Sequence, residues 1–80
     1  MKVNLLFFGE AKTIMKQGSI EIEFKGSNIK DLKTFLLKEN PKLCNILENS
    51  MFAVNMEYRS LDAELKDGET VAVIPPVGGG

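Results

Sequence analysis

The sequence has no histidine and a single cysteine, Cys44. Histidine is the commonest general base and metal ligand, so many hydrolytic and metal-dependent mechanisms lose their usual residue. A lone cysteine excludes an all-cysteine zinc site, a plant-type iron–sulfur site and an intrachain disulfide, and it suits a reducing compartment. The Walker loop, the GxGxxG loop and the GxSxG elbow are also absent. We therefore expect no metal site and no active site of its own, so that any part in catalysis is that of substrate or carrier.

Strong charge of either sign and long apolar runs are missing as well. Ten basic and eleven acidic residues give a net charge of -1, and no basic cluster marks a nucleic-acid interface. Apolar runs such as residues 5–8 and 71–74 are too short for a membrane helix or a signal peptide. With 80 residues and 44% apolar residues, the chain fits one globular domain. We expect a cytoplasmic protein that binds neither nucleic acid nor a membrane.

Five segments have the pattern of β-strands. Residues 19–25 alternate apolar and charged side chains, which predicts one buried and one exposed face. Residues 1–9 and 69–74 would place apolar side chains on both faces of a strand. Residues 52–55 and 58–59 add two shorter strands, with a turn at residues 56–57. Asp67-Gly68 predicts the turn before the last strand.

One main helix is predicted between the second and third strands. Asn28 is placed as its N-cap, Asp31 lies in its first turn, and Pro41 ends it. An apolar stripe at helical spacing would pack on the sheet and comprises Ile29, Leu32, Phe35 and Leu36. A second short helical piece follows around residues 43–47. Before the second strand, residues 11–15 could form a turn of helix. Leu61 and Leu65 are expected to anchor a covering loop.

This order of elements resembles the β-grasp (ubiquitin-like) fold. That fold is α+β, with a mixed sheet of about five strands packed on one main helix and the two terminal strands side by side in its middle. If Val3, Leu5 and Phe7 face the helix, the opposite face of the central strands is apolar too. Its predicted residues are Leu6, Phe8, Ala72 and Ile74, with Tyr58 beside them. Such an exposed patch marks a protein interface, unless residues 10–18 or 56–65 fold over it.

The sequence closes on two prolines, a valine and three glycines: Pro75, Pro76, Val77, Gly78, Gly79 and Gly80. The prolines favour an extended stalk, and glycines without a Cβ atom can enter a slot too narrow for other residues. We therefore divide the chain into a β-grasp domain, residues 1–74, and a flexible tail, residues 75–80. The tail is suited to deliver a terminal carboxylate into the active site of another protein. The alternative is a frayed terminus or a cloning remnant.

Residues 3–9, 53–55 and above all 65–80 resemble the molybdopterin synthase small subunit family, sulfur carriers of molybdenum cofactor biosynthesis. The resemblance implies that an ATP-dependent activating adenylyltransferase adenylates the Gly80 carboxyl group. A persulfide sulfur then replaces AMP and leaves a thiocarboxylate, which donates sulfur to a cyclic pterin precursor in the active site of the large subunit. It also implies a heterotetramer of two small and two large subunits. No cofactor is bound by the small subunit itself, because the activating partner uses the ATP.

The resemblance also assigns residues. Gly79 and Gly80 would thread both partner active sites, and Gly78 stands at a position that varies in the family. The partner-binding residues that it implies on this chain are Phe8, Tyr58, Ile74, Pro75, Pro76, Val77 and Gly78.

Other functions share parts of this pattern. Carriers of sulfur for thiamin, for transfer RNA thiolation or for cysteine use the same activation chemistry, although Pro-Pro-Val before the glycines favours the molybdopterin branch. A ubiquitin-like modifier would instead join Gly80 to lysines of target proteins, and an interaction module would leave the tail inert. Cys44 could hold a persulfide, but its apolar neighbours predict a small buried residue without a role.

Overall fold

The computed structural model describes residues 1–76, so the predictions for Val77, Gly78, Gly79 and Gly80 lie outside the described residues. The order of elements in the described part follows the predicted one, with one helix added near the start. In chain order the elements are β1 (Lys2–Phe7), α1 (Gly9–Met15), β2 (Ser19–Glu23), α2 (Ile29–Glu39), the 3₁₀ helix η1 (Pro41–Leu43), α3 (Cys44–Glu48), β3 (Met51–Val54), β4 (Glu57–Arg59) and β5 (Thr70–Ile74).

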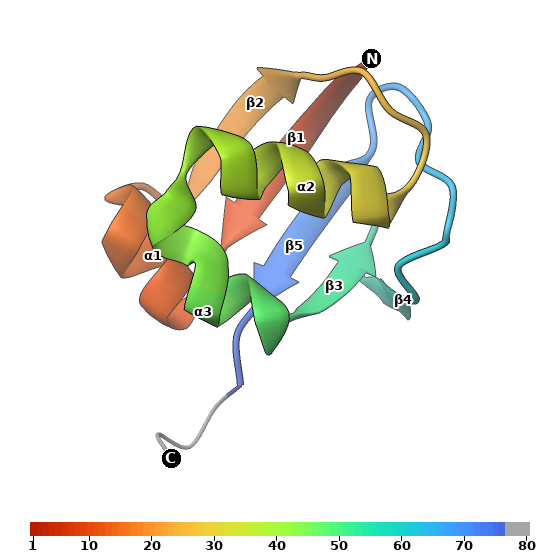
Figure 1. The fold of residues 1–80 in the computed structure, drawn as a ribbon. Helices are drawn as coiled ribbons and strands as arrows, with labels where there is room; N and C mark the ends of the chain where they lie inside the picture. The colour runs from red at the N-terminus through yellow and green to blue at the C-terminus, as the bar shows by residue number, and fades with distance from the viewer. Residues whose placement is uncertain (77–80) are drawn as a thin grey trace.

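The strands form one five-stranded mixed sheet in the order β2-β1-β5-β3-β4. β1 and β5 pair in parallel in its middle, and the other neighbouring strands are antiparallel. Helix α2 crosses one face of the sheet, and α1 and α3 lie at the end from which the C-terminal segment leaves (Figure 1). The predicted β-grasp arrangement of an α+β domain is confirmed. Among residues 1–76, no helix is both long and apolar enough to cross a membrane.

Helix α2 begins where its capping residues predict. The Asn28 Oδ1 atom accepts a hydrogen bond from the Asp31 backbone N–H at 2.8 Å, which satisfies a donor that the helix leaves free. The Asp31 carboxylate accepts in turn from the Ser27 N–H at 2.9 Å. This backbone hydrogen bond is the main reason why the pKa of Asp31 lies below its ordinary value of 3.8. The helix ends at Glu39, before Pro41.

The core lies between α2 and the sheet face that it covers. Val3, Leu5 and Phe7 of β1 are buried there, as predicted, together with Val71 and Val73 of β5. From α2, the stripe contributes Ile29, Leu32 and Leu36 as buried residues, while Phe35 is half-buried. Each large apolar side chain that is fully buried contributes roughly 1.5–3 kcal/mol of transfer free energy. The prediction that Val3, Leu5 and Phe7 face the helix is therefore confirmed.

Two local predictions are wrong. Leu61 is exposed, because the loop is held through its backbone: the Lys30 N–H donates to the Leu61 carbonyl at 2.8 Å. Leu65 is buried, as predicted. The turn between β3 and β4 lies at Asn55 and Met56, one residue earlier than predicted, and both have positive φ (49° and 71°). That geometry matches the twist of a two-residue hairpin, which asparagine tolerates better than methionine.

Candidate functional site: the open sheet face and the base of the tail

The outer face of the sheet carries apolar side chains in two rows across its central strands. Strand register places Leu6 beside Ala72, Ala72 beside Ala53, and Ala53 beside Tyr58. In the second row, Ile74 pairs with Met51, and Phe8 directly follows the end of β1. Phe8, Met51 and Tyr58 are 47%, 55% and 62% exposed. We call the surface formed by Leu6, Phe8, Met51, Ala53, Tyr58, Ala72 and Ile74 the open face.

Exposure is uneven across the open face. Ala53 and Ala72 are only 5% and 4% exposed, although they point away from the core, because larger neighbours flank their methyl groups. Ile74, predicted to be exposed, is half-buried. The exposed apolar area is therefore supplied mainly by Phe8, Tyr58 and Met51. Met51 was missed by the sequence analysis, although it has the same parity as Ala53.

The described chain does not cover this face. Helix α1 buries Ala11 in the core and packs against β1, β5 and η1. The loop after β4 is bound to the start of α2, where the Leu65 N–H donates to the Ser27 carbonyl at 2.8 Å. The alternative that one of these segments folds over the patch is wrong, and the predicted exposed apolar surface is confirmed for Phe8 and Tyr58.

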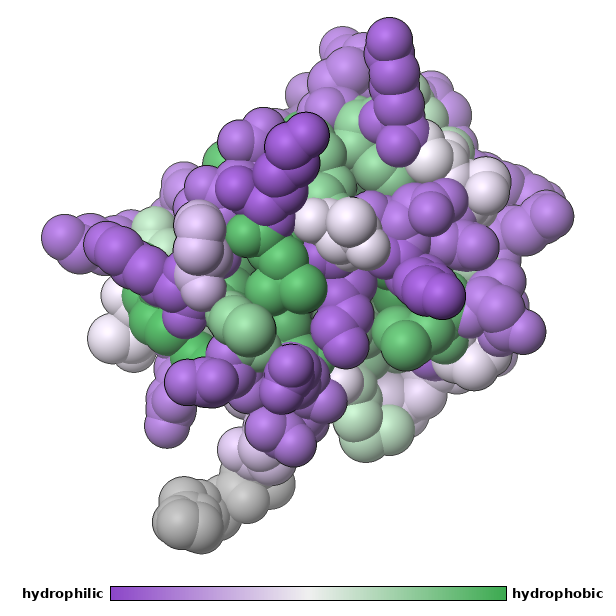
Figure 2. All heavy atoms as spheres, viewed as in Figure 1, coloured by the Kyte–Doolittle hydropathy of each residue, from purple (hydrophilic) through white to green (hydrophobic). Residues whose placement is uncertain are grey.

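The helical side of the molecule has a different character. Hydrophilic residues cover most of it, and apolar atoms show only in small separate areas between them (Figure 2). No ionisable side chain among residues 1–76 is buried, and these residues hold no cluster of three His, Cys, Asp or Glu side chains suited to a metal ion.

The two prolines at the end of β5 differ in their surroundings. Pro75 is buried and Pro76 is exposed. A Cβ atom placed on Gly9, whose φ is +54°, would lie 3.8 Å from the Pro75 Cγ atom, so the Pro75 ring packs beside the start of α1. Of the two prolines proposed to meet a partner, only Pro76 presents its surface in the described structure.

Cys44 is exposed, which corrects the prediction of a buried side chain. It is the first residue of α3 and directly follows Leu43, which is buried in the core. Residues one position apart on a helix do not share a face, so the apolar surroundings in sequence did not place Cys44 itself inside. The structure shows a free cysteine at the surface.

Known proteins resemble this chain along its whole length. The sequence model of the ThiS family matches residues 5–80. The molybdopterin synthase sulfur carrier subunit of Chlamydomonas reinhardtii is 34% identical over 83 residues, which covers 100% of both chains.

Two solved structures extend the comparison. Molybdopterin converting factor subunit 1 from Pyrococcus furiosus superposes with a TM-score of 0.85 at 31% identity, covering 96% of this chain and 99% of that one. A chain of the Helicobacter pylori complex of subunits 1 and 2 of molybdopterin-converting factor superposes with a TM-score of 0.72 at 32% identity, covering 100% of both chains. With this fold, this open face and these relatives, the chain belongs to the ThiS family.

Proposed function

We propose that the protein is the sulfur carrier subunit of a molybdopterin synthase and donates sulfur from a thiocarboxylate at Gly80. One observation carries the proposal: the chain aligns over its full length with a molybdopterin synthase sulfur carrier subunit at 34% identity. The absence of histidine and the lack of a buried ionisable group among the described residues agree with a carrier that depends on the active sites of its partners.

The chemistry needs only one group from this chain, the carboxylate of Gly80. A carboxylate is a poor electrophile, because its charge is delocalised and oxide is a poor leaving group. An activating enzyme joins the carboxylate to AMP and releases pyrophosphate from ATP. A persulfide sulfur then attacks the acyl carbon and displaces AMP. Cleavage of the remaining sulfur–sulfur bond by a thiol leaves the thiocarboxylate.

In the second stage, the thiocarboxylate sulfur acts as the nucleophile towards a cyclic pterin precursor, forming a carbon–sulfur bond and displacing an oxygen substituent from that carbon. Hydrolysis of the resulting acyl–sulfur bond leaves the sulfur on the pterin and restores the Gly80 carboxylate. Glycine suits both stages, because a backbone without Cβ atoms can lie in a narrow channel and adopt most φ and ψ values. We propose that Gly79 and Gly80 enter the active sites, with Val77 and Gly78 in the approach.

The open face is the proposed contact surface for the catalytic large subunit. The Helicobacter pylori neighbour is described as a protein–protein complex of two such subunits, which supports a partner of this kind. Phe8, Tyr58 and Ile74 lie on the face, with Met51 added by the structure. Aromatic side chains near the centre of an interface commonly provide most of the binding free energy. A heterotetramer with two large subunits remains the proposed assembly.

Intact mass spectrometry tests the proposed modification. The protein is incubated with its activating enzyme, ATP and a persulfide donor, with ATP omitted in the control. The mass should rise by the difference between one sulfur and one oxygen atom, and fragment ions should place the change at Gly80. A matched chain that lacks Gly79 and Gly80 should keep its fold, since terminal residues contribute little to stability, and should gain no sulfur. Sulfur on the shortened chain would contradict the proposal.

A further inference from the structure

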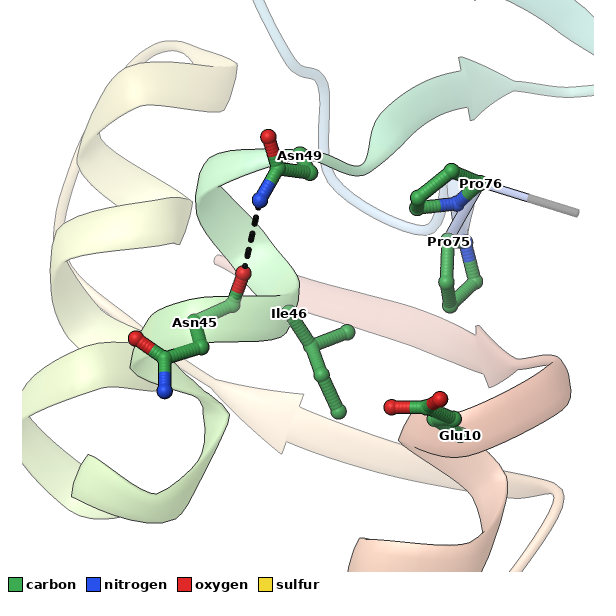
Figure 3. A pocket seen from close by; sticks show the side chains of 6 residues that line it. All are labelled: Glu10, Asn45, Ile46, Asn49, Pro75 and Pro76. Carbon is green, nitrogen blue, oxygen red and sulfur yellow. Dashed lines mark hydrogen bonds between the residues drawn. The ribbon is translucent and has the colours of Figure 1, made fainter. Parts of the chain in front are cut away.

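A pocket of about 190 Å³ lies at the base of the C-terminal segment, between α1, α3 and the prolines that follow β5. Its lining residues are Glu10, Asn45, Ile46, Asn49, Pro75 and Pro76. The Ile46 side chain and the Glu10 carboxylate are directed into the space beside Pro75 (Figure 3). We call it the tail-base pocket. It is separate from the open face, because none of its lining residues belongs to that face.

The size of the tail-base pocket suits one side chain. Sites for drug-sized ligands measure roughly 300–1,000 Å³, and this pocket is smaller, at about 190 Å³. Its walls combine apolar and acceptor groups. Ile46 and the two proline rings are apolar, whereas Glu10 contributes a carboxylate. The Asn49 Nδ2 atom donates to the Asn45 carbonyl at 3.1 Å, so the amide nitrogen of Asn49 is already engaged.

Glu10 is exposed, and neither of the ion pairs among residues 1–76 involves it. Its place in the first turn of α1 is favourable for a negative charge. That preference explains why a carboxylate is tolerated here but not why it lies at the mouth of an apolar pocket. A lysine or arginine side chain would satisfy both parts of the site, because its hydrocarbon stem packs on apolar surface while its charged end stays polar.

We propose that the tail-base pocket receives a lysine or arginine side chain of the catalytic large subunit. The stem would lie on Ile46 and Pro76, and the cation would meet the Glu10 carboxylate. The inference rests on the proposed function, since it assumes that this subunit takes up the tail. Phe8 of the open face is two residues from Glu10, and the Ala11 N–H donates to the Phe8 carbonyl at 3.2 Å. A subunit that covers Phe8 and encloses the tail therefore reaches the pocket.

The test is calorimetric titration of the full chain with its purified large subunit at low and high NaCl concentration. Glu10→Gln keeps the size of the side chain and removes its charge. It should raise the Kd roughly three- to fivefold at low salt, the range expected for a partly exposed ion pair. The difference should largely vanish at high salt, where such charges are screened. Glu64→Gln is the matched control. Glu64 is also exposed, but its backbone forms a β-bridge with Asn28, which caps the start of α2.

A second variant tests the pocket without removing the carboxylate. Asn49→Lys puts a cation at the rim of the pocket, where it can pair with Glu10, and should weaken binding at least as much as Glu10→Gln. Thermal melts of the free variants should stay close to the wild type, because both positions are exposed and Asn49→Lys loses only a surface hydrogen bond to the Asn45 carbonyl.

The outcomes separate the two proposals. Failure of the wild-type chain to bind the large subunit would overturn the proposed function. Binding by the wild type with no effect of Glu10→Gln at any salt concentration would overturn only the pocket inference. The inference would also be wrong if Glu10→Gln weakened only binding to the activating enzyme, or if it changed only self-association measured by sedimentation.

Discussion

The two faces of the central strands carry similar side chains and meet different surroundings. On one face, Val3, Leu5 and Phe7 are buried beneath α2. On the other, Leu6 and Phe8 of the same segment lie at the surface, half-buried and exposed. Nothing in the described chain covers this second face, although its composition is that of a core. We propose that the domain folds on one face and keeps the other for a partner.

The edge strand β2 shows that the open face is a local feature of the sheet. Its alternating pattern places Glu21 and Glu23 on the exposed side and Ile20 and Ile22 towards the core. Charged side chains on an edge strand discourage pairing with a further strand. Apolar residues on the outer surface of the sheet therefore lie on β1, β5, β3 and β4 and not on β2. A partner that binds there comes into position to receive the tail.

Loss of Phe7 should have the largest effect on the free protein. Phe7 is 2% exposed within the core, so Phe7→Ala should lower the free energy of unfolding by roughly 3 kcal/mol or more through a cavity and lost apolar contact. Urea unfolding followed by circular dichroism measures the change. A small change for Phe7→Ala beside a large one for Phe8→Ala would invert the assignment of the two faces.

Phe8→Ala is the matching change on the open face and should act on binding. It should weaken the complex with the large subunit by on the order of 2 kcal/mol, the scale of a central aromatic contact. The melting temperature of the free subunit should move little, because truncating an exposed side chain opens no internal cavity. Titration calorimetry and thermal melts on the same samples test both statements. Unchanged affinity in a well-folded variant would remove Phe8 from the interface.

The cap of α2 offers a smaller test of how the covered face is maintained. Asn28→Ala removes the acceptor for the Asp31 N–H and should cost about 1 kcal/mol of stability. Binding to the large subunit should be unchanged once the protein is folded, because the cap lies on the helical side. Asn28→Asp retains an acceptor and should recover most of the loss. If urea unfolding shows no recovery, the cap interaction is not the cause.

Cys44→Ser should have the smallest effect. Cys44 is exposed, so a hydroxyl group there is not desolvated and stability should remain within about 0.5 kcal/mol of the wild type. Sulfur loading should also persist, because the proposed carrier atom belongs to Gly80. Mass spectrometry after activation compares the two proteins. A folded Cys44→Ser chain that no longer accepts sulfur would move the carrier site to the thiol.

Local sequence patterns predicted most of the fold, because the residues that define a strand face or a helix end lie close together in the sequence. Alternation defined β2, and the Asn28 cap and Pro41 defined the limits of α2. Strand parity predicted the open face, and the tail motif predicted the family. Burial of individual residues in loops and at helix ends was harder to predict. Leu61 is apolar and Cys44 lies among apolar residues, yet both are exposed. The tail-base pocket joins Glu10, α3 and Pro75 across distant parts of the chain, and no spacing in the sequence reveals it.

In the proposed function, the chain carries sulfur from one partner to another. The most direct measurement follows a heavy sulfur isotope on the loaded Gly80 after addition of the large subunit and a cyclic pterin precursor. The isotope should leave the chain, appear in the pterin product and return the chain to its unmodified mass. Retention of the isotope on the chain, or a covalent bond between Gly80 and a lysine of another protein in place of transfer, would contradict the claim.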